Sequence, residues 1–539
     1  MLQLTDKGLA DRKAWEDKGY NLPQFDRAVM RVETAAAPKW VHFGAGNIFR
    51  AFQANLMQKL LNEKEEKAGI IAVDGFDYEI ILKNYRPHDD LSILVTLKAD
   101  GNIEKTVIGS IGASYVMDRD YEDFEVLKKI FANPSLQMIS FTITEKGYSL
   151  TDAKGELLTA ISEDFSKGPV EATSYLGKVA SLLYERYKNG ACPLAMVSMD
   201  NCSHNGDKLF AAIDAFAKKW SEAGLCEEDF RAYIENPEKV SFPWTMIDKI
   251  TPRPDESVRK MLEDDGLDLT YAETSRHTFI APYVNAEESE YLVVEDGFPN
   301  GRPALEKAGV YFTDRETVNK VERMKVCTCL NPLHTALAVF GCLLGYEKIC
   351  DEMKDEDLRK LVTGVGYVEG LPVVTDPKII EPSSFIDTVV NVRIPNPFMP
   401  DTPQRIATDT SQKLSIRYGE TIKAYLNDDR LDVKDLKLIP LVQAAWIRYL
   451  MKLDDEGKAM ELSSDPLLEE LSAYSDKLEL GKENKESLKE KLAGLLDNEK
   501  IFGVKLTEAG LADQVIAYLD ELCKGPGQVR KTLHEAVNQ

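Results

Sequence analysis

Short apolar runs alternate with amphipathic stretches between residues 39 and 198 of the chain. The runs have the length and β-branched content of strands, and they lie at residues 39–43, 70–73, 93–97, 106–111, 138–143 and 194–198. The stretches that separate them repeat apolar residues at helical spacing, most clearly at residues 49–64, 122–132 and 171–188. Strands that alternate with helices in this way predict a largely parallel sheet covered by helices.

The pattern changes from about residue 314, where strand-like runs nearly vanish. Long amphipathic helices are expected at residues 315–326, 332–345, 353–364, 402–426, 435–451, 466–474, 484–496 and 508–523. Two segments interrupt them: residues 366–400 are rich in proline and β-branched residues, and residues 453–465 form a polar linker. We therefore predict an α/β domain over residues 1–313, followed by an all-α, mainly helical domain over residues 314–539.

A glycine turn follows the first apolar run, where the sequence reads Gly44-Ala45-Gly46-Asn47-Ile48-Phe49. The first glycine permits a tight turn, and the second lets a pyrophosphate approach the backbone at a helix N-terminus. Phenylalanine replaces the third glycine of the G-x-G-x-x-G pattern. A strand before the turn and a helix after it are the context of a dinucleotide-binding loop. The first domain is therefore predicted to be of the Rossmann type.

The second apolar run ends at Asp74, near the offset at which a carboxylate holds the adenosine ribose of a dinucleotide. A carboxylate at this position favours NAD over NADP. Asp77 competes for the role, and a solvated loop position is the alternative for Asp74. The expected cofactor is NAD.

Composition narrows the possible partners. The chain has 539 residues, of which 44% are hydrophobic and 29% charged, as is typical of a soluble globular protein. The net charge of −24 argues against nucleic acid and anionic membrane surfaces as partners. No apolar run is expected to approach the roughly 18 residues of a membrane helix, and the N-terminus has no apolar signal core. We expect a cytoplasmic protein, either a monomer or a weak homo-oligomer.

The cysteines and histidines do not predict a disulfide framework or a metal site. Eight cysteines are few for this length, and Cys327 and Cys329 are too close for a C-x2-C zinc motif. None of the six histidines has the i, i+4 spacing of a helical metal pair. Buried reduced thiols and no metal are expected.

The segment 324–334, Met-Lys-Val-Cys-Thr-Cys-Leu-Asn-Pro-Leu-His, carries the best candidate chemistry. Lys325 can act as a general base when burial lowers its pKa, and the Asn331 carboxamide can donate to an oxyanion. His334 can orient a hydroxyl or pass on its proton. This set suits removal of a proton from a secondary alcohol while hydride leaves its carbon.

Six ordered blocks resemble those of a known family. They are VHFGAGNIFRAFQ (41–53), TITEKGY (142–148), SMDN (198–201) followed by HNG (204–206), FPWTMIDKITP (242–252), ED (295–296) with GRP (301–303), and DTSQK (409–413). Together they are similar to the long-chain mannitol dehydrogenase family, which also holds fructuronate (mannonate) and tagaturonate reductases. The resemblance covers nearly the whole chain.

The resemblance implies a Rossmann-type domain, a helical domain, NAD(P) as cofactor and no zinc. It makes Lys325 the general base, with Asn331 and Asn201 holding the substrate oxygen, Asp248 tuning the proton path and His334 positioning the substrate. The residues implied in cofactor binding are Gly44, Ala45, Gly46, Asn47, Ile48, Asp74, Thr144, Glu145 and Asn201.

Two departures from the family pattern concern the substrate side. The family usually separates its lysine and asparagine by five residues, whereas Lys325 and Asn331 are six apart. A one-residue bulge or π-type turn would restore the geometry; otherwise Lys325 does not reach the site. Family members also carry a basic pair shortly after the Asn-Pro of residues 396–397, where this chain has Pro400 and Asp401. Arg393 remains as a candidate to bind substrate.

Each of these residues also has an ordinary structural interpretation. Lys325 could lie on a helix surface, and His334 could be a satisfied core histidine. Asp248 could pair with Lys249 or Arg253, because an uncompensated buried carboxylate is costly. Asn201 could cap a turn, and Arg393 could pair with any acid. Lys413 is read as a structural partner.

The function expected from the resemblance is NAD-dependent, metal-independent oxidoreduction of a linear six-carbon sugar acid or polyol. D-mannonate/D-fructuronate, the reaction of a fructuronate reductase, is slightly favoured. The alternatives are D-mannitol/D-fructose, as in a mannitol 2-dehydrogenase, and a tagaturonate reductase. A catalytically silent nucleotide-binding protein on the same fold is the rival from another class.

Overall fold

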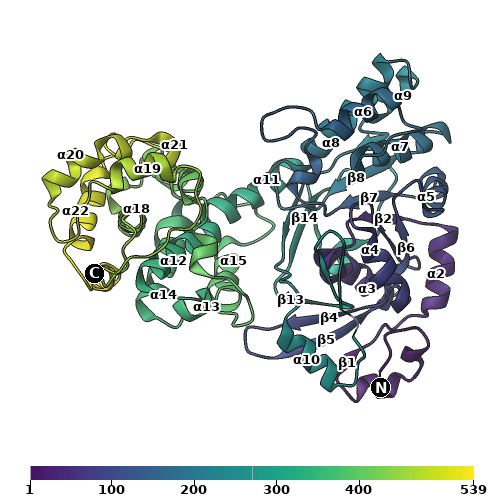
Figure 1. Ribbon diagram of the computed structural model, residues 1–539, viewed down its shortest axis with the longest axis horizontal. Helices are drawn as coiled ribbons and strands as arrows, with labels where there is room; N and C mark the ends of the chain where they lie inside the picture. The colour runs from purple at the N-terminus through teal and green to yellow at the C-terminus, as the bar shows by residue number, and fades with distance from the viewer. Residues whose placement is uncertain (1, 270) are drawn as a thin grey trace. The chain divides into compact units, whose positions relative to one another are not determined.

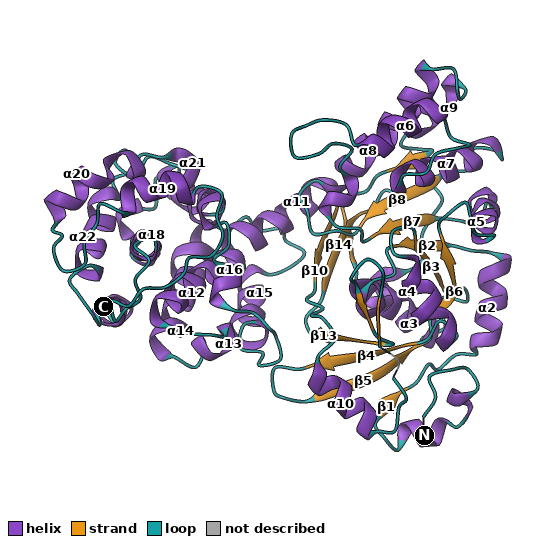
Figure 2. Cartoon of the chain, viewed as in Figure 1, coloured by secondary structure: helices purple, strands orange, loops and turns teal. Residues whose placement is uncertain are grey.

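The computed structural model describes residues 2–269 and 271–539, which form two compact units. The first consists of residues up to Lys98 and of Asn102–Asn319, and the second of Ala99–Gly101 and Lys320–Gln539. Strands β1 to β15 all lie in the first unit, whereas the second is built from helices (Figures 1 and 2). An α/β unit followed by a helical one confirms the predicted fold class.

A six-stranded parallel sheet organises the first unit. Its strands are β2 (Trp40–Phe43), β3 (Ile70–Asp74), β6 (Ile111–Val116), β7 (Met138–Phe141), β8 (Leu194–Ser198) and β9 (Val240–Ser241). They are arranged in the order β6-β3-β2-β7-β8-β9, and every neighbouring pair is parallel. Numbered along the chain, this is the 3-2-1-4-5-6 order of a Rossmann sheet, with its switch point between β2 and β7.

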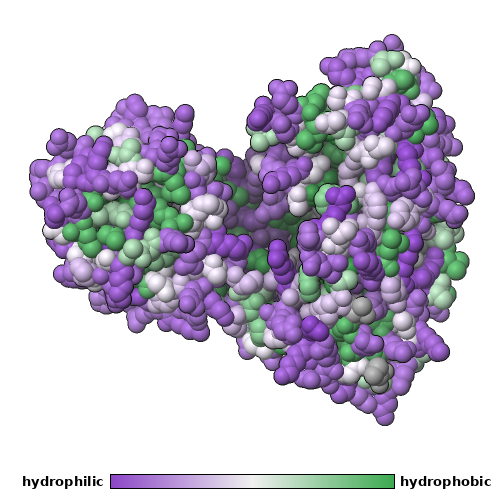
Figure 3. All heavy atoms as spheres, in the orientation of Figure 1, coloured by the Kyte–Doolittle hydropathy of each residue, from purple (hydrophilic) through white to green (hydrophobic). Residues whose placement is uncertain are grey.

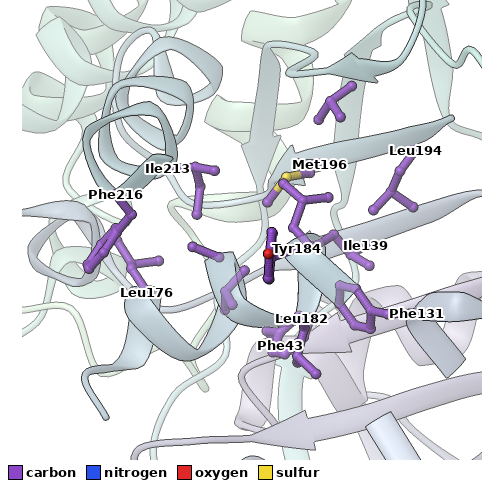
Figure 4. Close-up of a cluster of buried hydrophobic side chains, with 14 of the residues drawn as sticks. Phe43, Phe131, Ile139, Leu176, Leu182, Tyr184, Leu194, Met196, Ile213 and Phe216 are labelled. Carbon is purple, nitrogen blue, oxygen red and sulfur yellow. The ribbon is translucent and has the colours of Figure 1, made fainter. Parts of the chain in front are cut away.

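Helices and alternating side chains cover both faces of this sheet. Val41, Phe43, Ile71 and Val73 belong to one core cluster, while Trp40, Ile70 and Ala72 belong to another. Because successive residues of a strand point to opposite faces, strands buried on both sides read as continuous apolar runs. Figure 4 shows the first cluster, where side chains of the strands meet those of the helices. The principal helices are α3 (Ala54–Asn62), α5 (Asp123–Ala132), α7 (Tyr175–Lys188) and α8 (Asn205–Glu222).

Two of the predicted strands belong to a different sheet. β4 (Ser92–Leu97) and β5 (Ile103–Ile108) form an antiparallel pair within a four-stranded sheet of order β1-β5-β4-β13. The prediction that residues 93–97 and 106–111 join the parallel sheet is therefore wrong. The short connection 98–102 could have revealed this, because a parallel crossover needs a dozen or more residues. The third strand of the Rossmann sheet is β6, which begins where the predicted run ended.

The other elements of the first unit are shorter or lie outside the main sheet. The strands are β1 (Tyr20–Asn21), β10 (Thr245–Asp248), β11 (Ala272–Glu273), β12 (Phe279–Ile280), β13 (Tyr283–Glu287), β14 (Tyr291–Glu295) and β15 (Tyr311–Thr313). The helices are α1 (Arg12–Glu16), α2 (Arg27–Ala36), α4 (Tyr78–Ile80), α6 (Thr159–Lys167), α9 (Glu228–Glu235) and α10 (Glu256–Asp264). β10, β14 and β15 form a three-stranded sheet.

The second unit packs around two helices that are buried almost all round, α12 and α18. Its helices, with α11 leading into it, are α11 (Arg315–Met324), α12 (Asn331–Leu344), α13 (Ile349–Glu352), α14 (Glu356–Thr363), α15 (Pro382–Thr388), α16 (Pro403–Ile406), α17 (Glu420–Leu426), α18 (Leu438–Tyr449), α19 (Leu468–Ser475), α20 (Lys485–Leu496), α21 (Glu499–Phe502), α22 (Ala512–Leu522) and α23 (Gln528–Val537). A helix apolar on all sides is typical of a protein core.

The prediction of one continuous helix over residues 402–426 is wrong. α16 ends at Ile406, a 3₁₀ turn follows at Thr410–Gln412, and a π-helical turn at Ser415–Gly419 leads into α17. The segment 366–400, which was expected only to interrupt the helices, contains the end of a π-helical turn at Gly364–Gly370, a 3₁₀ turn at Leu371–Val373, α15 and another π-helical turn at Val389–Arg393. Side-chain periodicity tolerates such turns, because one extra residue shifts the apolar stripe by less than a third of a turn.

One helical stretch corrects the expectation about apolar runs. Arg315–Leu344 is continuously helical over 30 residues and contains an 18-residue window apolar enough for a membrane span. That window is 83% buried inside the protein, as expected of a core helix. The expectation that no apolar run approaches this length was wrong because the two predicted helices, 315–326 and 332–345, are joined through the π turn Lys325–Cys329. The face seen in Figure 3 is mostly hydrophilic, with scattered apolar patches.

Candidate active site

The glycine turn lies at the carboxyl end of β2, at the switch point of the sheet. Gly44 has φ of +105°, and its N–H donates to the carbonyl of Val73 at 2.9 Å. A Cβ at Gly44 would lie 2.2 Å from the Thr142 carbonyl oxygen, whereas a Cβ at Gly46 would meet no atom within 4 Å. Gly44 is thus required by the turn itself, while Gly46 faces open space that a ligand can enter.

A chain of buried hydrogen bonds fixes this turn to β7. Trp40 Nε1 donates to Ser140 Oγ at 2.7 Å, and His42 contacts Ser140 Oγ through Nδ1 at 2.6 Å and Thr142 Oγ1 through Nε2 at 2.9 Å. Thr142 Oγ1 donates to the Gly44 carbonyl at 3.2 Å. Burial lowers the pKa of His42 to about 3, so the imidazole is neutral. Sequence reasoning gave His42 no role, because its partners lie about a hundred residues away.

Asp74 binds the glycine turn directly. Its carboxylate accepts from the backbone N–H groups of Ala45 at 3.2 Å and of Phe76 and Asp77 at 2.8 Å each. Burial raises the pKa of Asp74, and these three hydrogen bonds oppose that shift. The alternative of a solvated loop position is therefore wrong. Asp77 is also buried, and it accepts from the Thr274 hydroxyl at 2.6 Å.

Asp200 brings two of the resembling blocks together. It follows β8 and accepts from the backbone N–H groups of Ile143 and Thr144 at 2.9 Å each, and from the Tyr148 hydroxyl at 2.6 Å. Thr144 has φ of +65°, a strained conformation that this anchor maintains. The exposed side chain of Asn201 comes next in the chain. Sequence reasoning cited Asp200 only as part of a block and missed its organising contacts.

The strand ends collect the predicted cofactor residues at one edge of the sheet. Residues 44–48 follow β2, Asp74 ends β3, Thr144 and Glu145 follow β7, and Asn201 follows β8. Because all these strands are parallel, their carboxyl ends meet at the same edge, where Rossmann domains bind ligands. Glu145 is exposed and forms an ion pair with Lys208.

Asp248 is the last residue of β10 and is buried. The suggested ion pair with Lys249 is wrong, because the Lys249 ammonium lies 3.0 Å from Glu290 Oε2 and donates to the Glu287 carbonyl at 3.0 Å. The side chains of Asp248 and Lys249 point in opposite directions, because successive residues of an extended chain face opposite sides.

In the second unit, Lys325 begins a π-helical turn that runs to Cys329. The Leu330 N–H donates to the Lys325 carbonyl at 3.1 Å, an i to i+5 bond, and α12 begins at Asn331. Pro332 explains the irregularity, because it has no N–H and its ring would clash with the carbonyl of Thr328 in a regular helix. The π-type turn that the spacing required is thus present.

The π turn compensates for the extra residue. In an α-helix five residues advance the side-chain direction by about 500°, that is about 140° beyond one full turn. A π turn accommodates one additional residue, so six residues span nearly the same rotation. The π turn is therefore the local geometry expected to keep Lys325 and Asn331 in the relative direction of the five-residue spacing.

The environment of Lys325 differs from its ordinary structural interpretation. Lys325 is only 4% exposed, so it is not a surface lysine. Asn331 and His334 are half-buried on the first turn of α12, where the His334 N–H donates to the Leu330 carbonyl at 3.1 Å. An amine, a carboxamide and an imidazole thus share one short helical segment, and the last two are open to a ligand.

A second π-helical turn, Ser415–Gly419, packs on this segment. The Tyr418 hydroxyl donates to the Pro332 carbonyl at 2.7 Å, and Arg417 Nη1 donates to Thr335 Oγ1 at 2.5 Å. Thr335 Oγ1 also lies 3.1 Å from the Asn331 carbonyl and donates to it. Sequence reasoning missed Arg417, because it lies 82 residues from its partner and no local pattern marks it.

The remaining basic candidates lie elsewhere in the second unit. Arg393 is 5% exposed in the π turn Val389–Arg393. Asp401, which stands where the family carries a basic residue, forms an ion pair with Arg405. Lys413 donates to the Thr408 carbonyl, in line with a structural role. Over residues 2–269 and 271–539, no group of three or more His, Cys, Asp and Glu side chains is placed to hold a metal ion.

The parallel sheet with a glycine turn at its switch point and the helical unit that follows define a two-domain protein of the Rossmann dinucleotide-binding class. Residues 38–307 match the family described as "Mannitol dehydrogenase Rossmann domain", and residues 317–523 match "Mannitol dehydrogenase C-terminal domain". The chain belongs to the mannitol dehydrogenase family of oxidoreductases, which confirms the resemblance found in the sequence.

Individual relatives support this assignment over the full length. The chain is 52% identical to the D-mannonate oxidoreductase of Thermotoga maritima, over 100% of this chain and 99% of that protein. The mannitol 2-dehydrogenase of Pseudomonas fluorescens, solved as a ternary complex with NAD and D-mannitol, is 26% identical with a TM-score of 0.67 and full coverage of both chains. A substrate-free D-sorbitol dehydrogenase is also 26% identical, with a TM-score of 0.73 over 92% of this chain and 97% of that one.

Proposed function

We propose that the protein is an NAD-dependent oxidoreductase that interconverts D-mannonate and D-fructuronate. The observation that carries the chemistry is the π turn that begins at buried Lys325 and ends shortly before Asn331, at the start of α12. The similarity to the Thermotoga maritima D-mannonate oxidoreductase along the whole chain supports the choice of substrate.

The residues present fit a dinucleotide in the domain that we propose to span residues 1–313. Gly46 leaves open space beside the backbone of the turn, and the side chains of Asn47 and Ile48 are only half-buried. Bound there, NAD would supply the acceptor for a hydride. The residues proposed to hold it are Gly44, Ala45, Gly46, Asn47, Ile48, Asp74, Thr144, Glu145 and Asn201. The Asp74 carboxylate beside the turn favours NAD over NADP, whose 2′-phosphate it would repel.

In the domain that we propose to span residues 314–539, Lys325 takes the proton of the substrate hydroxyl. The Asn331 carboxamide donates to the oxygen as negative charge develops on it, and His334 orients the substrate. In the first domain, Asn201 is proposed to hold a substrate oxygen and Asp248 to tune the proton path. No metal ion has a part in this proposal.

Arg393 is one candidate cation for binding a sugar-acid substrate. The replacement of the family's basic pair by Pro400 and Asp401, and the pairing of Asp401 with Arg405, favour the alternative of a neutral substrate. D-mannitol/D-fructose is therefore the second candidate reaction, and D-tagaturonate is a further candidate substrate. We also propose that the protein is cytoplasmic and is a monomer or a weak homo-oligomer.

The substrate is tested by following NADH oxidation with D-fructuronate, D-tagaturonate and D-fructose in parallel. D-fructuronate is expected to give the highest kcat/KM, and NADPH to be a poorer donor than NADH. The rate is expected to be unchanged after treatment with a chelator. Absence of turnover with all three substrates would disprove the proposed substrate class.

Lys325→Ala separates an enzyme from a silent nucleotide-binding protein. Loss of a general base is expected to lower kcat by about 10²- to 10⁴-fold, while the Kd for NADH changes by less than about threefold, because the glycine turn is untouched. Lys354→Ala, at an exposed lysine of the same domain, is the matched control and should keep full activity. Activity that survives in Lys325→Ala would refute the base assignment.

A further inference from the structure

Arg417 is a cation for which the protein supplies little compensation. Its guanidinium makes a single hydrogen bond, to Thr335 Oγ1, and no carboxylate of the residues described here forms an ion pair with it. By contrast, the guanidinium of Arg186 donates to five backbone carbonyls, and that of Arg448 to three.

The Arg417 side chain is also half-buried. Burial lowers its pKa to about 10, an effect that the Tyr418 hydroxyl opposes in part. The side chain is therefore still charged at neutral pH, and its desolvation is not repaid by a protein anion. Such a group is stabilised when an anion binds beside it.

The position of Arg417 connects it with the proposed catalytic segment. Its partner Thr335 follows His334 directly, and the Thr335 hydroxyl is bonded to the Asn331 carbonyl. The neighbouring Tyr418 holds the same turn of α12 through the Pro332 carbonyl. The guanidinium is thus anchored, through one threonine, to the helical turn that carries Asn331 and His334.

We propose that Arg417 binds the carboxylate of the sugar-acid substrate and so determines selectivity for an acid over a neutral polyol. The planar guanidinium can donate two parallel hydrogen bonds to a carboxylate, a geometry that neither a hydroxymethyl group nor a lysine reproduces. The inference rests on the proposed function. It assigns to Arg417 the binding of the carboxylate, for which the family's basic pair is missing in this chain.

The test compares D-mannonate with D-mannonamide, which has the same carbon skeleton without the charge. Wild-type protein with NAD is expected to prefer the acid. Arg417→Met, which keeps the aliphatic length, is expected to raise the KM for D-mannonate by about 30-fold or more while changing kcat/KM for the amide by less than about threefold. The KM of Arg417→Lys for D-mannonate should lie between those of wild type and Arg417→Met. Arg430→Met, at an exposed arginine of the same domain, is the matched control and should behave as wild type.

A second variant keeps the test decisive if Arg417→Met folds poorly. Thr335→Val keeps the shape of the side chain but removes the oxygen that holds the guanidinium. It is expected to lower kcat/KM for D-mannonate by about tenfold without a matching loss for the amide. Thr335→Ser restores a hydroxyl and should rescue acid selectivity. If the acid and the amide lose kcat/KM equally in both variants, Arg417 only positions α12 and the proposal is overturned.

Binding separates this inference from the proposed reaction. D-mannonate is expected to raise the Tm of wild-type protein and not that of Arg417→Met, while NADH raises the Tm of both. If wild-type protein shows no turnover but this difference persists, the reaction is wrong and the carboxylate site stands. If Arg417→Met still binds D-mannonate as wild type does, or if Arg393→Met alone loses acid selectivity, Arg417 is not the carboxylate site.

Discussion

Glu352 shows how much a single buried side chain can influence the stability of the second unit. Its side chain is completely buried, and neither carboxyl oxygen has a hydrogen-bond partner among the described residues. It packs against Gly341 of α12, where a Cβ would lie 2.3 Å from Glu352 Oε1. Burial raises the pKa of Glu352 from 4.5 to about 9, so the group is protonated in the folded protein at neutral pH.

This shift predicts that stability falls with rising pH. Between pH 4.5 and about 9 the unfolded chain releases this proton and the folded protein keeps it, so the free energy of unfolding decreases by about 1.4 kcal/mol per pH unit from this group. Glu352→Gln should remove that part of the slope. Denaturant unfolding at pH 5 and pH 8 measures it, with exposed Glu356→Gln as the control. A slope unchanged in Glu352→Gln would contradict the assignment.

Alanine substitutions at the two glycines of the turn are expected to affect stability and NADH binding differently. In Gly44→Ala the Cβ collides with the Thr142 carbonyl and φ is +105°, so both Tm and NADH binding should fall. In Gly46→Ala the Cβ meets no protein atom within 4 Å, so Tm should stay within about 1 °C of wild type while the Kd for NADH rises by about tenfold or more. Thermal unfolding and fluorescence titration distinguish the two. Equal binding by wild type and Gly46→Ala would place the pyrophosphate elsewhere.

At the scale of elements, π-helical turns accompany the candidate chemistry. Phe49–Gln53 follows the glycine turn, Lys325–Cys329 precedes Asn331, and Val389–Arg393 and Ser415–Gly419 carry Arg393 and Arg417. A π turn redirects the residues that follow it without ending the helix, and such turns are frequent at functional sites. Local irregularity in these helices thus sets the direction of the polar side chains.

The role of the turn at Lys325 can be tested by changing its length. Deleting half-buried Val326 leaves five residues from Lys325 to Asn331, and a regular α-helix would then preserve their relative direction. This variant should keep activity within about tenfold of wild type. Inserting one alanine after Val326 rotates Lys325 by about 100° and should abolish turnover. Circular dichroism and Tm provide the control for folding. If the insertion and the deletion are equally active, the alignment does not matter for catalysis.

At the scale of the whole molecule, each unit has its own hydrophobic core and its own set of candidate residues. The glycine turn and the Asp200 anchor belong to the first unit, and the Lys325 segment and Arg417 to the second. Ligands that bind different residues should therefore leave separate signatures in the chain.

Hydrogen exchange with mass spectrometry can read these signatures. NADH is expected to slow exchange in residues 44–48 and 142–148 of the first unit, because ordering by a ligand suppresses local opening. D-mannonate is expected to protect residues 325–335 and 415–419 of the second unit. Gly46→Ala should lose the first protection and Arg417→Met the second. Protection by D-mannonate confined to the first unit would refute the proposed substrate residues.

The sequence by itself determined the elements and the local chemistry. The apolar runs located β2, β3, β7 and β8, the glycine turn located the predicted cofactor edge, and the spacing from Lys325 to Asn331 raised the alternative of a π turn, which is present. These features are encoded within short windows, where side-chain period and backbone chemistry act directly.

Only the tertiary structure decided which partners these residues have. It assigned residues 93–97 to a second sheet, paired Lys249 with Glu290 in place of Asp248, and set Arg417 against Thr335 from 82 residues away. Local periodicity does not encode such contacts, because strand pairing and buried hydrogen bonds depend on how distant segments pack together. The proposed general base was therefore readable from its neighbours in sequence, whereas the proposed carboxylate site required the fold.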